Sequence, residues 1–457
     1  MPRYLIYAAA QHESFKRAEL AALAELEGVP VDLADCREET PFCYVDLVDD
    51  AAAARLVRRS ILARAVYAVW AAGPTMDAVR AELRAKPELC VPFRDASFRF
   101  DVVSYQGSSS RAQQRELMES FGFMDLQGPI RMKGADHVFA IFEDFHFLEK
   151  SHAPAAKRLR SAAFGRLVAE SDRAAVDKYD LKKRAYIGTT SFDAELSLVC
   201  ANIAQVAPGK LVYDPFVGTG SFLVAASHFG GTAIGSDIDG RQIRGKKNAT
   251  IAGNYAQYGL GAFFQDIFAC DFTHNPLRPS LRLDAIICDP PYGVREGLKV
   301  LGARNPQKLS EMLATVDSGD KSHLLPDYIP PKKPYHFDAL LIDLVEFSAV
   351  HLVDNGRMCC WIPVSNDDYR DVDIPTHPDL EIVANCVQVF SKWSRRLVAY
   401  RRKPRAETAG AEVAPAAGFS RPQTAAILGT EQFRDKYFRG FRPADGPAAP
   451  GAGPGAG

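Results

Sequence analysis

The hydrophobic pattern of the N-terminal third alternates between short strands and amphipathic helices. Residues 3–9 form an apolar run typical of a strand, and residues 13–27 repeat apolar side chains at helical spacing before Gly28. The same reasoning predicts further strands at 41–49, 65–72, 98–107 and 137–145, and helices at 51–62, 76–85 and 111–122. This alternation predicts an α+β N-terminal half.

From about residue 186 the pattern becomes strand, turn and helix in repeats. Strands that alternate with helical segments favour a doubly wound parallel α/β sheet. Residues 298–335 form a long insertion, and the Ala-, Gly- and Pro-rich tail at 406–457 is predicted to be largely disordered. In this part of the chain the predicted strands are KLVYD, GGTAIGSD, GAFFQDIF, LDAIICD and RMCCWIPV, followed by two late strands at 382–390 and 396–401. Helices are predicted at 221–228 and 339–353.

Composition narrows the class of protein. The chain carries 55 basic and 56 acidic residues, so no global field indicates a nucleic-acid partner, and only local stretches such as 150–184 and 391–405 are basic. Nine cysteines without a CxxC pair predict buried free thiols in a reducing compartment and no metal site. Charges interrupt every apolar run before 18 residues, and the first residues favour a strand over a signal peptide. These features predict a cytoplasmic protein without membrane spans.

A glycine turn and two later acids predict a nucleoside pocket. The turn DPFVGTG (214–220) follows an apolar strand and precedes a helix, where glycines let the backbone approach a cofactor. Position 223 is Leu, so the third glycine of the dinucleotide fingerprint is missing, which speaks against NAD. Asp237 ends the next predicted strand and suits ribose hydroxyls, while Asp266 is predicted to close the third strand and to suit an adenine amine.

The turn DPPYG (289–293) is the most specific signal in the chain. It follows the apolar strand LDAIIC. Asp289 and the carbonyl of Pro290 can accept hydrogen bonds from an exocyclic amine, and Asp289 can take its proton. Pro291 stiffens the turn, and Tyr292 can stack on an extruded base, which offsets part of the cost of flipping. The pattern predicts modification of an exocyclic amine on a planar base.

These motifs resemble a known family of enzymes. DPFVGTGSF, GSDID and DPPYGVRE resemble the S-adenosylmethionine-dependent amino-methyltransferases. The stretch YDLKKRAYIGTTSFDAELSLVCANIA is similar to the catalytic subunit of the eukaryotic tRNA guanosine-10 N2-methyltransferases, and residues 98–145 resemble an RNA-binding THUMP module. The resemblance implies a ferredoxin-like domain at 1–85, a THUMP-like domain with a basic connector at 86–178, and a Rossmann-like methyltransferase domain at 179–405.

The resemblance also implies roles for individual residues and partners. The catalytic turn would consist of Asp289, Pro290, Pro291 and Tyr292. Cofactor contacts would come from Asp214, Phe216, Gly218, Gly220, Asp237, Ile238, Asp266, Ile267 and Thr190. Phosphate contacts to tRNA are predicted for Lys157, Arg158, Arg160, Lys182, Lys183 and Arg184. The family further implies a small zinc-binding activator protein as partner in a heterodimer, which an apolar sheet edge near 359–361 and the late strands could bind.

Two other functions fit part of the sequence. An N6-adenine methyltransferase acting on RNA or DNA would use the same DPPY turn, although the THUMP-like segment disfavours it. An inactive RNA-binding scaffold would require a decayed pocket, whereas each predicted cofactor position carries a chemically suitable residue.

Overall fold

The computed structural model of the chain divides into two compact units. One comprises Met1–Arg184 and Phe192–Gln205, and the other comprises Ala185–Ser191 and Val206–Gly457. The structure describes residues 1–147, 157–247, 249–293, 298–302, 307, 310, 331–366, 374–391, 393–408 and 437. Most of the predicted insertion and nearly all of the predicted disordered tail therefore lie outside the described residues. No helix within the described ranges is long and apolar enough to cross a membrane.

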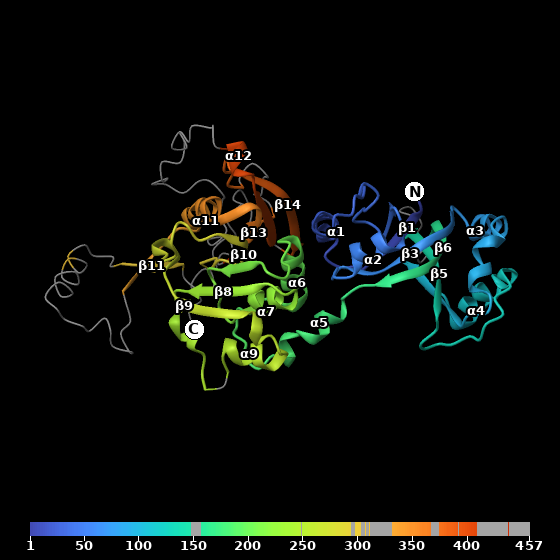
Figure 1. Cartoon of the computed structure of the whole chain (residues 1–457), viewed down its shortest axis with the longest axis horizontal. Coiled ribbons are helices and arrows are strands. Elements are labelled where there is room, and N and C mark those ends of the chain that lie inside the picture. The colour runs from blue at the N-terminus through green and yellow to red at the C-terminus, as the bar shows by residue number, and fades with distance from the viewer. Residues whose placement is uncertain are drawn as a thin grey trace, which may run out of the picture. The chain divides into compact units, whose positions relative to one another are not determined.

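A six-stranded sheet organises the first unit (Figure 1). The strands lie in the order β2-β1-β3-β6-β5-β4, and neighbours pair antiparallel except β4 and β5. The strands are β1 (Arg3–Ala8), β2 (Phe42–Asp46), β3 (Ala63–Gly73), β4 (Phe98–Tyr105), β5 (His137–Phe147) and β6 (Lys157–Glu170). Because β3 pairs with β6, the segments on either side of the predicted boundary at residues 85 and 86 share one sheet.

Strand β6 corrects the prediction of a basic connector at 150–184. Residues 157–170 lie between β3 and β5 in the interior of the sheet, and Ala163 and Phe164 are fully buried. Basic and apolar residues are mixed in KRLRSAAFGRLVAE, so the charge count concealed the strand. Among the described residues of the predicted connector, those from Lys157 to Glu170 lie in this sheet and those after Glu170 lie outside it.

Helices accompany this sheet, and one of them, α6, comes from the later segment Phe192–Gln205. They are α1 (Glu13–Glu27), α2 (Asp50–Val57), α3 (Met76–Arg84), α4 (Arg111–Glu119), α5 (Ala174–Lys178) and α6 (Ala194–Ile203). Helix α6 packs against α1, where Asn202 Nδ2 donates to Glu19 Oε1 at 2.7 Å. Glu19 is fully buried and also accepts from Ser60 Oγ, and burial raises the pKa of its carboxyl group.

The expectation of free thiols is wrong for two cysteines. The structure pairs Cys36, which lies in the segment between α1 and β2, with Cys43 of β2 as a disulfide, and their Cα atoms are 4.5 Å apart. The fold brings the two residues together because the intervening chain turns back onto β2. The other seven cysteines are buried and form no disulfide.

A seven-stranded sheet organises the second unit, in the order β14-β15-β13-β10-β7-β8-β9 (Figure 1). The five strands from β13 to β9 are parallel to one another. Beyond β13, β15 pairs antiparallel with β13, and β14 pairs antiparallel with β15. The strands are β7 (Leu211–Asp214), β8 (Thr232–Asp237), β9 (Phe264–Ala269), β10 (Leu283–Cys288), β13 (Leu352–Ser365), β14 (Leu380–Val389) and β15 (Trp393–Arg402). The doubly wound parallel core is therefore confirmed, and its strand order reverses between β7 and β10.

Helices cover both faces of this sheet. Helix α11 (Phe337–His351) packs on the face that carries Ile286, Met358 and Val398, and α7 (Ser221–His228) packs against β7 and β8. In Figure 1, α7 and α9 lie on one side of the sheet and α11 on the other. The remaining elements are α8 (Gly240–Arg244), α9 (Ile251–Tyr258), α12 (Arg405–Thr408) and the two-stranded hairpin of β11 (Lys299–Leu301) and β12 (Lys332–Pro334).

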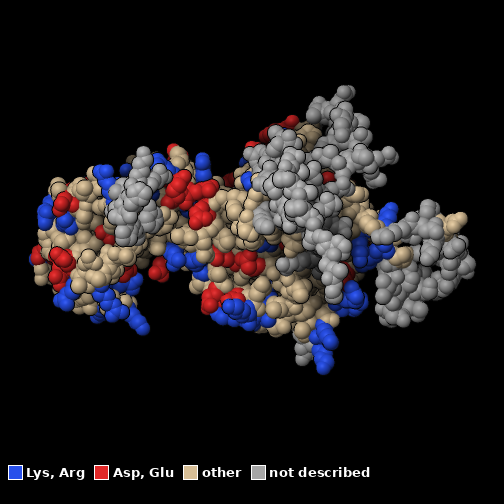
Figure 2. Space-filling view, turned by 180° about the vertical axis from the view of Figure 1, so that it is seen from behind, with Lys and Arg blue, Asp and Glu red and all other residues tan. Residues whose placement is uncertain are grey.

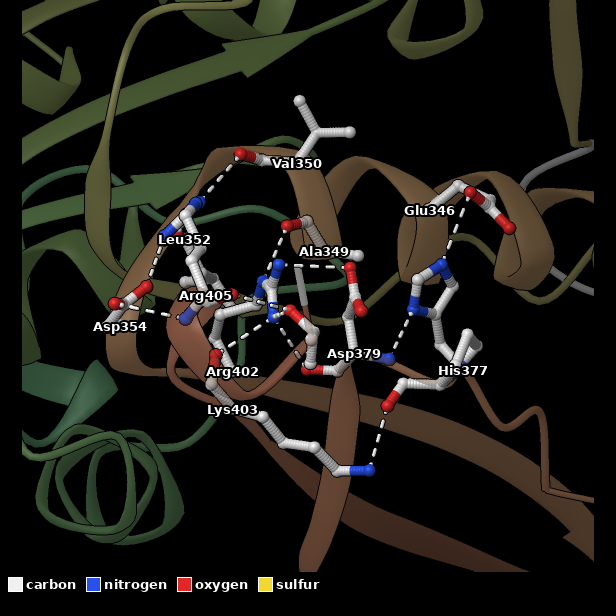
Figure 3. Close-up of polar contacts among 12 residues, drawn as sticks. Glu346, Ala349, Val350, Leu352, Asp354, His377, Asp379, Arg402, Lys403 and Arg405 are labelled. Carbon is white, nitrogen blue, oxygen red and sulfur yellow. Dashed lines mark hydrogen bonds and ion pairs between the residues drawn. The ribbon is translucent and has the colours of Figure 1, made fainter. Parts of the chain in front are cut away.

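A buried arginine joins the end of α11 to the late strands, as Figure 3 shows. Arg402 is 5% exposed; its Nε donates to the carbonyl of Ala349, and its Nη2 lies 3.0 Å from Asp379 Oδ2. Arg405 donates to Asp354 and to the carbonyl of Leu352. These bonds satisfy carbonyl groups where the helix ends, which α-helix geometry leaves without partners.

Candidate active site

The glycine turn is held in a conformation that favours glycine. Gly218 has φ 48° and Gly220 has φ 81°, and Gly220 caps the start of α7. A Cβ atom on Gly220 would lie 3.0 Å from Ile251 Cγ2. The turn is closed by a hydrogen bond from the Gly220 N–H to the carbonyl of Val217 at 2.7 Å. This region of backbone space is costly for residues with a Cβ, so the turn requires its glycines.

Asp237 connects the glycine turn to the next strand. It is the last residue of β8, and its Oδ2 accepts a hydrogen bond from the Gly218 N–H at 3.0 Å. Its Oδ1 accepts from the Asp239 N–H at 2.8 Å. The structure therefore brings the predicted cofactor residues Gly218 and Asp237 together, with half-buried Ile238 directly beside them.

Two carboxyl groups lie at the point where the strand order reverses. Asp214 ends β7 and Asp289 follows β10, and these strands are parallel neighbours. Asp214 is 1% exposed; burial raises its pKa well above the ordinary value, and the charges of Asp237 and Asp289 raise it further. Open α/β sheets bind ligands at such a reversal, outside the carboxyl ends of the strands.

The acidic turn forms a compact polar pair. The Tyr292 hydroxyl donates to Asp289 Oδ1, and the Tyr292 ring meets Phe337 edge-on at 6.1 Å between centroids. Burial raises the pKa of Asp289 to about 6, against the opposing effects of the positive Arg395 and the Tyr292 hydrogen bond. Burial and the Asp289 charge also raise the pKa of Tyr292 well above its ordinary value. Asp289 can thus change its protonation state close to neutral pH, which suits a proton acceptor.

Known proteins share both halves of this architecture. Residues 2–173 match the family described as "Tmrp11 THUMP N-terminal domain", and residues 182–314 match "RMKL-like, methyltransferase domain". The chain is 42% identical to the tRNA (guanine(10)-N(2))-methyltransferase of Saccharomyces cerevisiae, over 96% of this chain and 100% of that protein. It is 35% identical to the Schizosaccharomyces pombe protein of the same name, over 96% of both chains, and 30% identical to human TRMT11, over 96% of this chain and 95% of that one.

The chain belongs to the tRNA (guanine(10)-N(2))-methyltransferase family. The resemblance inferred from the motifs is confirmed, together with a THUMP-containing α+β half and an α/β methyltransferase domain.

One predicted cofactor residue of this family member lies away from the strand end. The prediction that Asp266 closes the third strand is wrong, because β9 continues to Ala269 and Asp266 is exposed within it. Its neighbour Ile267 is half-buried and pairs with Gly235. The carboxyl end of β9 lies instead where Ala269 pairs with Asp237.

Asp271 is the acid that the sequence reasoning missed. It is 5% exposed, and its Oδ1 accepts from the Thr273 N–H while its Oδ2 accepts from the Leu301 N–H at 2.8 Å. The next residue, Phe272, packs against the predicted cofactor residue Phe216 with ring centroids 5.4 Å apart. The apolar run that continues through Ala269 could have indicated that the strand ends later.

The segment before the glycine turn contacts it through the hydroxyl group of Ser191. Thr190 is exposed. Ser191 Oγ lies 2.6 Å from Thr219 Oγ1 and accepts from the Gly188 N–H at 2.8 Å. The structure thus places Ser191 against the turn, while a cofactor contact from Thr190 stays a prediction.

A cluster of aromatic and basic residues also joins this end of the sheet. Arg395 of β15 lies over the buried Trp361 ring at 5.1 Å, and its Nη2 donates to Gln388 Oε1 at 2.6 Å. Nearby, Phe390 and Trp393 stack at 4.6 Å, and Trp393 pairs with Ser365 at the carboxyl end of β13. In the sequence these residues appear only as a basic stretch. The pairing of β15 with β13 decides which of them lie near the acidic turn, and the sequence did not predict that pairing.

The predicted phosphate-binding residues differ in how exposed they are and in whether they form ion pairs within the protein. Arg158 and Lys182 are exposed, whereas Arg160 pairs with Asp144 at 2.7 Å and Lys183 pairs with Asp177 at 2.7 Å. Arg184 is only 6% exposed, which disfavours a phosphate contact from its side chain. Lys157 begins β6, and its side chain lies outside the described residues. On the face in Figure 2, basic side chains are interspersed with acidic ones.

Proposed function

We propose that this protein transfers a methyl group to the exocyclic 2-amine of guanosine 10 in tRNA. The observation that carries the proposal is the half-buried Asp289, which accepts a hydrogen bond from Tyr292 within a Pro-Pro turn. This turn follows β10, the parallel neighbour of β7, which ends at Asp214 before the glycine turn. Relatives that align with nearly the whole chain are tRNA (guanine(10)-N(2))-methyltransferases. Membership of this family supports guanosine over adenosine as the target.

The residues at the strand ends suit S-adenosylmethionine. This cofactor supplies an electrophilic methyl group. The open backbone of Gly218 and Gly220 would accommodate the methionine part beside Asp214 and Phe216. Asp237 would hold the ribose with Ile238 beside it, and Asp271, rather than the exposed Asp266, lies at the strand end next to it.

Asp289 would orient and deprotonate the amine. The Tyr292 hydroxyl occupies one carboxylate oxygen, which leaves the other to accept a hydrogen bond from the exocyclic amine. The second amine hydrogen can bond to the carbonyl of Pro290, and the two contacts aim the nitrogen lone pair at the methyl group. As the N–C bond forms and the S–C bond breaks, the proton released from nitrogen passes to Asp289. The half-buried Tyr292 ring provides a face for the base.

Methyl transfer to unmodified tRNA transcripts tests this function directly. With labelled S-adenosylmethionine, nucleoside mass spectrometry should find N2-methylguanosine, which Asp289→Ala should abolish while S-adenosylhomocysteine binding persists. A transcript with adenosine at position 10 serves as the control and should remain unmethylated. Methyl on adenosine instead would support N6-adenine methylation, and no methyl under any condition would support a scaffold.

The N-terminal half would capture the tRNA. Residues 2–173 match a THUMP domain, and exposed Arg158 and Lys182 can contact phosphates without reading sequence. Replacing both with Gln should weaken tRNA binding uniformly across tRNA sequences and should reduce the salt slope of log K by roughly 1.4 to 1.8, since each phosphate contact contributes roughly 0.7 to 0.9. An unchanged slope would exclude both residues from the interface.

A small zinc-binding activator protein remains the proposed partner in a cytoplasmic heterodimer. Of the segments suggested as an apolar sheet edge, residues 359–361 are not at an edge, because β13 lies between β10 and β15 and Trp361 is fully buried. The edges of the sheet are β14 and β9, and β14 exposes Ile382 and Val389. An exposed edge can accept a strand from a partner. If the chain alone is monodisperse and as active as the co-expressed pair, the activator is unnecessary.

A further inference from the structure

The β11–β12 hairpin follows the acidic turn and returns the chain to the sheet. Its register pairs Lys299 with Pro334 and Leu301 with Lys332. Leu298, just before it, is 8% exposed in the core cluster of α11 and β10, and its carbonyl accepts from the Tyr335 N–H at 3.1 Å. The base of the hairpin is therefore anchored in the second unit.

The first strand of the hairpin bonds to the loop after β9. The Leu301 N–H donates to Asp271 Oδ2 at 2.8 Å, while the Thr273 N–H donates to Oδ1 of the same carboxylate. Asp271 is nearly inaccessible, and Val300 beside the contact is 5% exposed. The hairpin backbone thus helps to fix the position of the carboxylate at the strand end.

The second strand bonds to the loop after β8. Lys332 Nζ donates to the carbonyl oxygen of Ile238 at 2.9 Å. Ile238 directly follows Asp237, whose carboxylate accepts from the Gly218 and Asp239 N–H groups. The Lys332 charge is also close enough to Asp239 to contribute to lowering the pKa of that carboxyl group, after the larger effect of Arg241. Lys332 is half-buried, whereas Lys333 next to it is exposed.

We propose that Lys332 is a cofactor-positioning residue, which holds the Ile238 carbonyl so that the Asp237 loop is set for the adenosyl part of S-adenosylmethionine. The proposal rests on the cofactor site described above. Strand β12 is hydrogen-bonded to the loop after β8, and strand β11 is hydrogen-bonded to the loop after β9. Lys332 touches neither the methyl donor sulfur nor the target amine in this scheme, so it acts on affinity through the loop.

Lys332→Met tests the contact because it keeps most of the aliphatic stem but removes the donor. Without this hydrogen bond the loop after β8 has to be ordered when the cofactor binds, which should weaken S-adenosylhomocysteine binding about tenfold in calorimetry. The rate constant at saturating cofactor should change by less than about twofold, because Asp289 and its turn keep their contacts. Lys332→Arg retains a charged donor and should recover most of the affinity.

Two controls separate positioning from a general loss of structure. Lys333→Met alters the adjacent, exposed lysine of the same strand and should bind S-adenosylhomocysteine as the wild type does. Methylthioadenosine, which keeps the adenosyl group and lacks the amino acid, should lose the same factor with Lys332→Met. All three variants should stay folded without cofactor, and the melting temperature of Lys332→Met should fall by only a few degrees because one hydrogen bond is lost.

The proposal and the proposed function fail in different ways. Wild-type affinity in Lys332→Met, or an equal loss in Lys333→Met, would overturn the positioning role. A wild-type protein that binds S-adenosylhomocysteine but methylates no tRNA would overturn the function, while the affinities of the Lys332 variants would still decide the positioning role.

Discussion

Replacing Asp289, the proposed proton acceptor, should stabilise the protein while abolishing activity. Asp289 has a pKa raised from 3.8 to about 6, chiefly by burial. The folded state therefore binds the carboxyl proton more tightly than the unfolded state does. Ionisation of Asp289 costs stability as the pH rises through this interval, and the cost is absent below about pH 4. Asn at this position cannot ionise, and its carbonyl can still accept from the Tyr292 hydroxyl.

The size of the effect follows from the shift. A change from 3.8 to about 6 corresponds to at most about 3 kcal/mol near pH 8, because water that reaches the half-buried carboxylate reduces it. About half of this gain should remain near pH 5, where the unfolded chain is ionised and the folded one is mostly protonated. In a domain of about 150–250 residues, about 1 kcal/mol shifts the melting temperature by roughly 2–4 °C.

Thermal unfolding of Asp289→Asn and wild type at both pH values measures this gain. The variant should melt several degrees higher near pH 8, with a smaller difference near pH 5. Asp266→Asn is the matched control, because Asp266 is exposed on β9 and its replacement should leave the melting temperature unchanged. A variant that melts at or below the wild-type temperature near pH 8, or a gain independent of pH, would refute the argument that burial of the charge is costly.

Three further results are expected. The value of kcat/KM for methyl transfer should fall about tenfold per pH unit below about pH 6, because protonated Asp289 cannot accept the amine proton; a flat profile from pH 5 to 8 would exclude it as the acceptor. Gly220→Ala should cost about 1–2 kcal/mol in unfolding measurements and weaken S-adenosylhomocysteine binding, because of its positive φ and the contact with Ile251; an unchanged protein would show that the turn adapts. Arg402→Met should lower the free energy of unfolding by about 3–5 kcal/mol because it leaves the half-buried Asp379 without its partner, and S-adenosylhomocysteine affinity in the folded variant should not change.

The sequence by itself determined the features that depend on neighbouring residues. Many of the strands and helices, the glycine turn and the acidic turn follow from patterns within about ten residues, whereas β6, with its mixed basic and apolar residues, does not. Gly218 and Gly220 were identifiable because positive φ angles are a local requirement of that turn. Parallel strands that alternate with helices also bring their carboxyl ends to one edge, so the meeting of Gly218 with Asp237 could be predicted.

Tertiary structure alone decided the contacts that join distant segments. Strand β9 continues to Ala269, which pairs with Asp237, so Asp266 lies within the strand and Asp271 follows its end. The pairing of β15 with β13 places Arg395 close enough to affect Asp289, and the return of β12 carries Lys332 to Ile238, 94 residues away in the sequence. Such contacts depend on how whole elements pack and pair, and a shift of one residue in register would exchange the two faces of a strand. Local sequence patterns do not by themselves fix the pairing of strands that are distant in the sequence.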